Sequence, residues 1–319
     1  MAHEPAQSAS AEQRRLRAGY LYGLAGVLLF ALTIPMTRLA GGSVENPQLP
    51  PDFVAIGRAA VAGLLALAWL AATRAPLPRR ELRGLLALSA AGAVFGFPLF
   101  LGWAVRHVEA VHAAVITGFL PLATAAVAVL WLRQRASAAF WACATLGCAL
   151  VAAYAWLKGG GRFDAADGLL LLAVLSAALS YVGGAQLSVA GLSGPQVISW
   201  MLVLCLPVTL PLTLTLAVGH WSQIGGQVHA AAWGGFAYVS VVSMWLGFFA
   251  WYRGLALGGT MKVSQVQLIQ PFASMLAAVP LLGERLDFAT IAFALAVIAT
   301  VFIGKRVPVS RAKPDLQGD

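Results

Sequence analysis

The stretch PLATAAVAVLWLRQR, residues 121–135, resembles PFASMLAAVPLLGER, residues 271–285. Six of the fifteen aligned positions are identical, at a constant offset of 150 residues. A polar position follows the same offset, because Thr117 falls opposite Gln267. Duplicated membrane proteins leave weak internal similarity of this kind. The chain is therefore expected to consist of two related halves.

The composition places most of the chain in lipid. Hydrophobic residues make up 60% of its 319 residues and charged ones 10%, and the mean hydropathy is +0.81. A helix needs about 20 apolar residues to cross a hydrocarbon core of roughly 30 Å. Ten such runs lie at 18–40, 53–73, 82–105, 109–132, 137–157, 167–190, 195–218, 231–257, 261–283 and 287–304. These runs are apolar on all sides, whereas barrel strands alternate polar and apolar residues, so helices are predicted.

The two halves are expected to have opposite orientations in the membrane. Each half contains five of the ten runs, and an odd number of crossings inserts the second copy upside down relative to the first. The predicted fold is an all-α integral membrane protein with ten transmembrane helices in two inverted five-helix repeats. Its predicted parts are a terminal segment at 1–17, repeats at 18–157 and 167–304, and a tail at 305–319.

The distribution of basic residues predicts the orientation of the whole chain. It has 21 Lys and Arg and a net charge of +9. With the amino terminus in the cytoplasm, 15 of them fall on the cytoplasmic side and 4 on the other, with Arg38 and Arg58 near the outer ends of their runs. This asymmetry follows the positive-inside rule. It predicts a multi-pass protein of the cell (inner) membrane with both termini cytoplasmic, and it argues against a nucleic-acid partner.

A polar helix face in the run 261–283 is the first candidate for a functional surface. At 100° per residue, Ser264, Gln267, Gln270 and Ser274 fall within an arc of about 120°, whereas Gln265 points away from it. An amide facing hydrocarbon would leave its donors and acceptors unpaired at a cost of several kcal/mol. This face must therefore meet a wet cavity or, alternatively, hold neighbouring helices together. Together with the equivalent positions of the first half, the candidates for a substrate cavity are Ser264, Gln267, Gln270, Ser274, Thr117 and Thr124.

Prolines within the runs are candidates for hinges. A proline inside a helix removes one backbone hydrogen bond and frees a carbonyl group. Pro121 and Pro271 do so at equivalent positions of the two halves, near the predicted bilayer midplane. Broken helices at that depth often surround a binding site. The hinge candidates are Pro121, Pro271, Pro98 and Pro35.

An aromatic stripe in the run 231–257 could add an apolar wall to the cavity. Five aromatic residues between Tyr238 and Tyr252 fall within about 100° of arc in a regular α-helix. A surface facing lipid or another helix is the alternative, since aromatic residues also anchor helices at the membrane interface. The aromatic cavity candidates are Trp245, Phe248 and Tyr252, with Trp103 from the run 82–105.

Charged residues within the runs restrict the chemistry of a substrate. No run carries an acidic residue at its centre, whereas Arg58 and His112 are basic and partly immersed. Arg58 is expected to snorkel to the outer interface, with pairing to a substrate carboxylate as the alternative. Glu109 and His112 have the spacing of a helical metal-ligand pair, but a second pair is missing and no metal is predicted. His112 remains a candidate titrating gate. A neutral, zwitterionic or anionic substrate is predicted.

The sequence also resembles a known family, the EamA-type transporters of the drug/metabolite transporter superfamily. In the second half the family's recurring pattern is matched by Ala256, Leu257, Pro271, Gly283, Glu284, Arg285 and Leu286, and FVAIGRAAVAG, with Arg58, is similar to the family's second helix. The first half departs from the pattern, with Arg133, Gln134, Arg135 and Ala136 in place of Gly-Glu-Arg-Leu. The resemblance implies a ten-helix bundle around a central cavity that exports or exchanges small metabolites without a cofactor.

A transporter working by alternating access is therefore the expected function, with a small molecule and the lipid bilayer as partners. Amino acids and related metabolites are favoured through the resemblance alone. The alternatives are a multidrug efflux transporter and an integral membrane enzyme acting on a lipid-linked substrate. The His-Glu-x-x-His and Gly-x-Ser-x-Gly signatures of two hydrolase classes are absent from the sequence, so no enzyme is predicted. The oligomeric state is left open.

Overall fold

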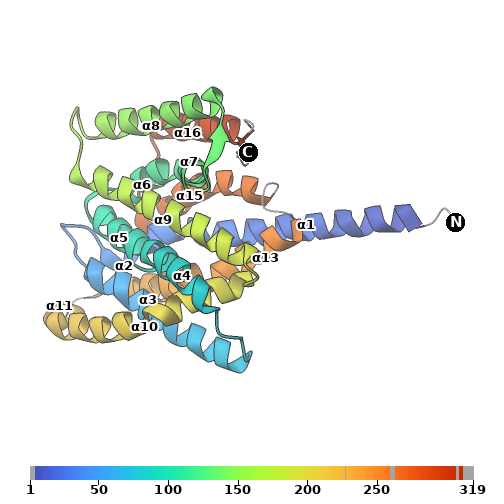
Figure 1. The fold of residues 1–319 in the computed structure, drawn as a ribbon. Coiled ribbons are helices and arrows are strands. Elements are labelled where there is room, and N and C mark those ends of the chain that lie inside the picture. Colours follow the sequence, from blue (N-terminus) through green and yellow to red (C-terminus); the bar gives the residue numbers. More distant parts are fainter. Residues whose placement is uncertain (1–3, 227, 259–262, 307–308, 312–319) are drawn as a thin grey trace, which may run out of the picture.

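The structure, a computed structural model, describes residues 4–226, 228–258, 263–306 and 309–311. These residues form a bundle of helices (Figure 1). In the first half the elements are α1 (Glu4–Ala31), α2 (Thr33–Gly41), α3 (Pro51–Ala72), η1 (Arg80–Leu82), α4 (Arg83–Ala90), η2 (Ala91–Gly96), α5 (Phe97–His107), α6 (Ala110–Thr117), α7 (Leu120–Trp131), β1 (Gln134–Ala136) and α8 (Ala138–Lys158). In the second half they are α9 (Ala165–Val189), α10 (Gly194–Gly219), α11 (Trp221–Ile224), α12 (Ala230–Ala237), η3 (Tyr238–Leu246), α13 (Gly247–Gly258), η4 (Ser264–Ile269), α15 (Gln270–Leu282), α16 (Phe288–Arg306) and β2 (Val309–Arg311).

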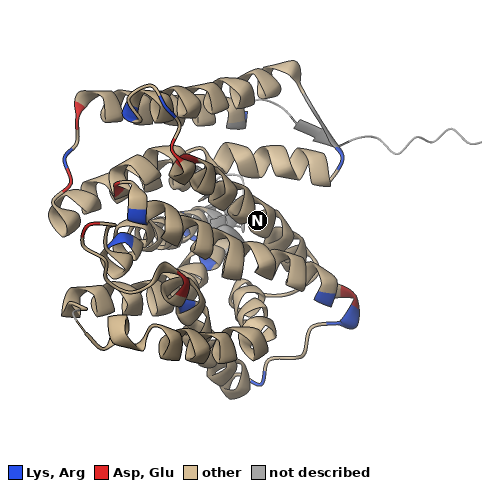
Figure 2. Ribbon diagram, turned by 90° about the vertical axis from the view of Figure 1, so that its left-hand side faces the viewer, with Lys and Arg blue, Asp and Glu red and all other residues tan. Residues whose placement is uncertain are grey.

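Helical stretches occupy the positions of all ten predicted runs. Within the described residues, eight of them are long and apolar enough to cross a membrane. The last two, Val266–Leu282 and Phe288–Gly304, are apolar but shorter. The chain is thus a multi-pass helical membrane protein, and the count of ten spans stays a prediction. Lys, Arg, Asp and Glu lie mainly at loops and helix ends (Figure 2), as expected where hydrocarbon surrounds the helices.

Two details of the predicted fold differ in the structure. β1 pairs with β2 in antiparallel register, Gln134 opposite Arg311, so the chain is not purely helical. Outside the helices the backbone groups of these segments need other partners, and strand pairing supplies them. α1 begins at Glu4 and projects beyond the bundle (Figure 1), so most of the segment 1–17 belongs to the first helix. Most of the predicted tail 305–319 lies outside the described residues.

Polar caps fix the ends of several helices. The Asp164 carboxylate accepts a hydrogen bond from the Ala166 N–H at 2.7 Å, and Asp167 accepts from the Asp164 N–H at 3.0 Å, which forms a capping box at the start of α9. α15 ends at Leu282, and the residue that follows, Gly283, caps it with a φ of +70°, which favours glycine. These caps fix the residues at which α9 begins and α15 ends, and therefore where the adjoining loops start.

The helices pair across the two repeats in a way that duplication predicts. α1 packs along α13 in the second half, and its equivalent α9 packs on α5 in the first half. α3 packs on α10, and α8 on α16, each with its own counterpart. The α1–α13 crossing is close because Gly254 lies against the backbone of Gly19 and Gly23, where any side chain would clash. A pseudo-twofold relation between the halves accounts for all four pairs.

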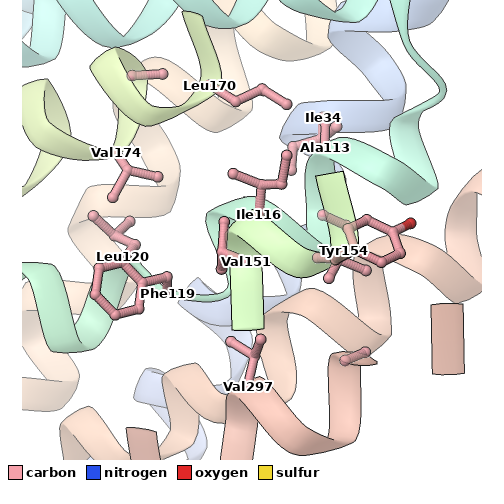
Figure 3. Packing of buried hydrophobic residues seen from close by; sticks show 14 of the residues in the cluster. Ile34, Ala113, Ile116, Phe119, Leu120, Val151, Tyr154, Leu170, Val174 and Val297 are labelled. Carbon is pink, nitrogen blue, oxygen red and sulfur yellow. The ribbon is translucent and has the colours of Figure 1, made fainter. Parts of the chain in front are cut away.

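Buried apolar side chains fill the space between α6, α7, α8, α9 and α16. Figure 3 shows Ile116 of α6 and Val151 of α8 among them, near Val297 of α16. Leu170 and Val174 of α9 belong to the same cluster. These side chains form one densely packed part of the bundle.

Several helices are interrupted at equivalent positions of the two repeats. η2 and η3 are π-helical segments, and adding 150 to the bounds 91–96 gives 241–246, inside η3. Residues 118–119 separate α6 from α7, and η4 precedes α15 as a 3₁₀ segment. Irregular backbone at membrane depth is tolerated where it is buried in protein or lines a cavity. These interruptions therefore indicate that the middle of the bundle is enclosed by protein or contains a cavity.

Candidate functional site

A cavity of about 70 Å³ lies between the two repeats. It has room for roughly five water molecules or one small solute. Its walls come from α1, α2, α3, η2, α5, α6 and α7 of the first half and from α9, η3, α13, η4 and α15 of the second. We call it the central cavity. Because both repeats build it, a movement of one repeat against the other would change its shape.

The strongest charge at the central cavity belongs to Arg58 of α3. Its guanidinium Nη2 donates to the Ser243 hydroxyl at 3.1 Å, and Ser243 in turn shares a hydrogen bond of 2.7 Å with Thr33 of α2. Arg58 is only 2% exposed. The expectation that it snorkels to the interface is therefore wrong: α3 packs that face on η3, and the side chain is enclosed within the bundle.

The predicted amide face also lies at the central cavity. Gln267 of η4 and Gln270 and Ser274 of α15 line it. Ser274 is 1% exposed, and its hydroxyl has no hydrogen-bond partner among the described residues. Ser264 belongs to η4, but its side chain is not among those described. A buried hydroxyl without a hydrogen-bond partner is energetically costly. The Ser274 hydroxyl is therefore available to hydrogen-bond a bound solute or a water molecule.

Three further candidates reach the central cavity, and they lie beside helix interruptions. Thr117, the last residue of α6, and Pro121, in the first turn of α7, line it next to the break between those helices. Pro271 occupies the equivalent first turn of α15. Proline at this position loses no helix hydrogen bond, because the first N–H groups of a helix have no partner within it. Pro98 and Pro35 also lie in the first turn of their helices, α5 and α2.

The cavity walls follow the repeat offset but differ in polarity. Adding 150 converts Phe30 into Ser180, Ala93 into Ser243, Thr117 into Gln267, Leu120 into Gln270 and Pro121 into Pro271, and all ten residues line the central cavity. The second repeat therefore supplies most of the hydroxyl and amide groups. Arg58 is the exception, since its equivalent Val208 is 56% exposed on the outer surface of α10. The two repeats therefore contribute equivalent positions but different polarity to the central cavity.

Most of the aromatic stripe does not face the central cavity. Phe248 lines it, whereas Trp245 is buried against Phe249 and donates to the Ser199 hydroxyl at 3.0 Å. Trp103 is 40% exposed on α5 and also lies outside the cavity. The prediction of the aromatic stripe used regular α-helical spacing. η3 is instead a π-helix, and its wider turns change the direction in which each side chain points.

A second, larger cavity of about 1240 Å³ adjoins the first. It contains the remaining candidates Thr124 and Tyr252, together with residues 192–194 at the start of α10. Tyr181 and Gln267 line both cavities. This larger cavity lies at the end of the bundle with the loops predicted to be cytoplasmic, so we call it the inner cavity.

A polar cavity of about 600 Å³ lies at the opposite end of the bundle, among the loops predicted to face outward. We call it the outer cavity. Among the described residues it shares no wall with the central cavity. Arg38 of α2 donates to the Val105 carbonyl of α5 in this region. The structure thus brings the central cavity close to the inner end and separates it from the outer end.

Glu284 joins the two repeats at the outer cavity. Its two carboxylate oxygens accept hydrogen bonds from the N–H groups of Ala110 and Val111, both at 2.8 Å. These groups are the free donors at the start of α6, where negative charge is favoured. Burial raises the pKa of Glu284, although the two hydrogen bonds act in the opposite direction. The sequence pattern singles out Glu284 but contains no signal for its partner in the other repeat.

His112 has a partner that was not expected. Its Nε2 lies 2.7 Å from Oδ1 of Asp167, and both side chains are buried. Glu109, which has helical metal-ligand spacing to His112 in the sequence, is exposed at the amino end of α6. Among the described residues, no group of three or more His, Cys, Asp or Glu could hold a metal ion. His112 stacks near Tyr154, with ring centroids 5.0 Å apart, away from the central cavity.

Comparison with known proteins agrees with this architecture. The EamA-like transporter family matches residues 17–155 and 165–304. The uncharacterized transporter YdeK of Bacillus subtilis (strain 168) is 42% identical over 289 residues, which cover 90% of this chain and 97% of YdeK. A solved crystal structure has the same fold with a TM-score of 0.58 at 18% identity, covering 92% of this chain and 99% of the other.

Proposed function

Because the chain belongs to the EamA-like transporter family and is a membrane transporter rather than an enzyme, we propose that it moves a small neutral, zwitterionic or anionic metabolite through the central cavity. The observation that supports this substrate class is the chemistry of the cavity wall. Hydroxyls, amides and one guanidinium line it, and none of its described lining residues is acidic. An amino acid or a related compound is the favoured substrate.

A multidrug exporter of lipophilic cations is a weaker alternative. Such a transporter needs a carboxylate in the cavity to bind the cation and, alternately, a proton. Arg58 would repel a cation at close range in this poorly screened environment. Phe30, Phe97 and Phe248 in the wall instead suit an apolar part of a metabolite.

The proposed mechanism is alternating access between the two ends of the bundle. The central cavity adjoins the inner cavity through Tyr181 and Gln267 and is separated from the outer cavity. Rocking of one repeat against the other could reverse this arrangement. Residues 118–119 and η4 interrupt the helices that line the cavity, which allows the two parts of each helix to tilt separately. In this proposal the chain has ten spans and both termini are cytoplasmic, in the cell membrane.

Flux measurements in proteoliposomes test the proposal. The purified full chain is reconstituted alone, and uptake of radiolabelled amino acids, amino-acid amides and other small carboxylates is compared with protein-free liposomes. We expect saturable uptake of at least one compound, together with acceleration of exchange from preloaded liposomes. Equal flux with and without protein across the whole set would contradict the proposed function. Transport of tetraphenylphosphonium in place of these compounds would support the multidrug alternative.

A further inference from the structure

Arg58 is a buried cation whose hydrogen bonds are largely unmade. A guanidinium has five N–H donors, and in Arg58 one hydrogen bond is formed, from Nη2 to Ser243 at 3.1 Å. Nε and Nη1 are buried without a partner among the described residues. An unpaired charge removed from water is strongly unfavourable. The guanidinium of Arg58 is therefore expected to bind a partner of opposite charge.

That partner does not come from the described part of the protein. None of the described residues around the central cavity is acidic. The buried Asp167 is paired with His112, Glu284 with the start of α6, and Asp287 with Lys158. Arg58 therefore faces a cavity that lacks an opposite charge, although both repeats are arranged around it.

The groups next to Arg58 add further donors and hold its position. Ser243 accepts the hydrogen bond from Arg58, so its own proton is free to point to Thr33 at 2.7 Å. The Thr33 hydroxyl proton then has no acceptor among the described residues, while Thr37 fixes the turn by donating to the Thr33 carbonyl. A rigid set of donors around one positive charge is suited to an anion.

The shape of the cavity restricts which anion fits. A guanidinium matches a carboxylate in a planar, two-point contact. The single positive charge of Arg58 also balances the single negative charge of a carboxylate, whereas a phosphate dianion would leave one negative charge unbalanced. Phe30, Met244 and Phe248 supply an apolar wall beside this end, and Gln270 and Ser274 supply polar groups for the remainder of the molecule. The cavity is confined between the two repeats, which suits a small solute.

We propose that Arg58, supported by Ser243 and Thr33, is the carboxylate-binding subsite of the central cavity, and that the substrate is a small monocarboxylate. This inference rests on the proposed function and narrows its substrate class, because neutral metabolites are excluded. The carboxylate occupies the side of the cavity formed by α3, α2 and η3. The other polar groups of the substrate lie toward α15.

The test compares acids with their primary amides, which have nearly the same shape but no negative charge. Leucine with leucinamide, and phenylacetate with phenylacetamide, are each used as competitors of flux in proteoliposomes and as ligands in thermal-shift measurements of the purified full chain. We expect wild-type protein to prefer the acid at least about tenfold, as loss of a charged hydrogen bond implies. Arg58→Gln should remove this preference. Arg58→Lys should keep part of it, because the charge remains while the two-point contact is lost.

Arg79→Gln is the matched control, since it makes the same change at an exposed position in a loop and should leave the ratio of acid to amide unchanged. Equal transport of acids and amides by wild-type protein would overturn the carboxylate subsite while leaving the proposed function in place. An unchanged preference in folded Arg58→Gln would overturn the role of Arg58. Absence of flux for every compound would instead overturn the proposed function, and the subsite with it. The comparison within wild-type protein keeps the inference testable even where Arg58→Gln does not fold.

Discussion

Glu284 and Ala110, 174 positions apart in the chain, are joined by a hydrogen bond of 2.8 Å from the Ala110 N–H to the Glu284 carboxylate. The contact links the loop after α15 in the second repeat to the start of α6 in the first. α6 ends at Thr117 on the central cavity. A movement that separates the repeats at the outer end must therefore break this cap.

Removal of the cap should favour opening of the outer end. In Glu284→Ala the first N–H groups of α6 lose their acceptors, at a cost of about 1 kcal/mol in the closed arrangement. We expect water-borne maleimides to label Met275→Cys several times faster from the outside, because Met275 is buried on α15, where Ser274 lines the central cavity and Leu282 lines the outer cavity. Asn46→Cys in an exposed loop controls for reagent access, with Cys143, Cys148 and Cys205 replaced by Ala. Unchanged labelling would show that Glu284 does not hold the outer end closed.

The same cap predicts a dependence on pH. Burial raises the pKa of Glu284 in the closed arrangement, and an exposed Glu284 in an open one would titrate nearer its ordinary value. The arrangement with the higher pKa binds the proton more tightly, so acidification between the two values favours closure. Labelling of Met275→Cys from outside, corrected by Asn46→Cys, should therefore fall as pH drops through this range. Glu284→Gln should remove the dependence, and a rise in labelling at low pH would contradict the assigned sign.

Gln270 should be required for normal transport but not for folding. Gln270→Leu removes an amide from the central cavity and should abolish uptake or raise KM at least about tenfold, because a polar group of the substrate loses its partner. Membrane insertion and the melting temperature should change little. Ile269→Leu is the control, since Ile269, the last residue of η4, is the exposed neighbour of Gln270 in the chain. Wild-type kinetics in folded Gln270→Leu would refute a role in binding.

Water should reach Gln267 from the inner end of the bundle. Gln267 lines both the central and the inner cavity, so a cysteine there should react with membrane-impermeant maleimides added on the side of the termini. Val208→Cys, at the equivalent of Arg58 but on the outer surface of α10, should stay unreactive within lipid. Inside-out and right-side-out vesicles separate the two directions. Protection of Gln267→Cys from both sides would mean that solvent does not enter the cavity.

Asp167 should contribute strongly to stability. It bonds to buried His112 at 2.7 Å and also belongs to the capping box of α9. Removing one member of a buried pair costs roughly 3–5 kcal/mol, whereas losing a helix cap costs about 1 kcal/mol. Asp167→Ala should therefore lower the melting temperature much more than Asp164→Ala, which removes only a cap. Equal effects would assign Asp167 to capping alone.

Much of the architecture could be predicted from local patterns. Hydrocarbon accepts helices whose backbone groups are paired internally, so long apolar runs indicate helices. The offset between residues 121–135 and 271–285 was sufficient to predict two halves, and the comparison with the EamA-like transporter family matches both of them. Helical periodicity also brought Gln267, Gln270 and Ser274 together, and these residues share the central cavity in the structure. Their role in transport stays a prediction.

The tertiary structure decided which partners meet. Arg58 is enclosed because η3 of the other repeat packs on α3, and Trp245 leaves the cavity because η3 is a π-helix. His112 meets Asp167, and Glu284 meets Ala110, across distances that no periodicity connects. The composition of a segment and the spacing of its polar residues determine whether it forms a helix and which face of that helix is polar, because both properties depend on residues within a few turns. The group that a face meets depends on how distant helices pack. Here that packing places the Arg58 guanidinium, which has no acidic partner among the described residues, beside the central cavity.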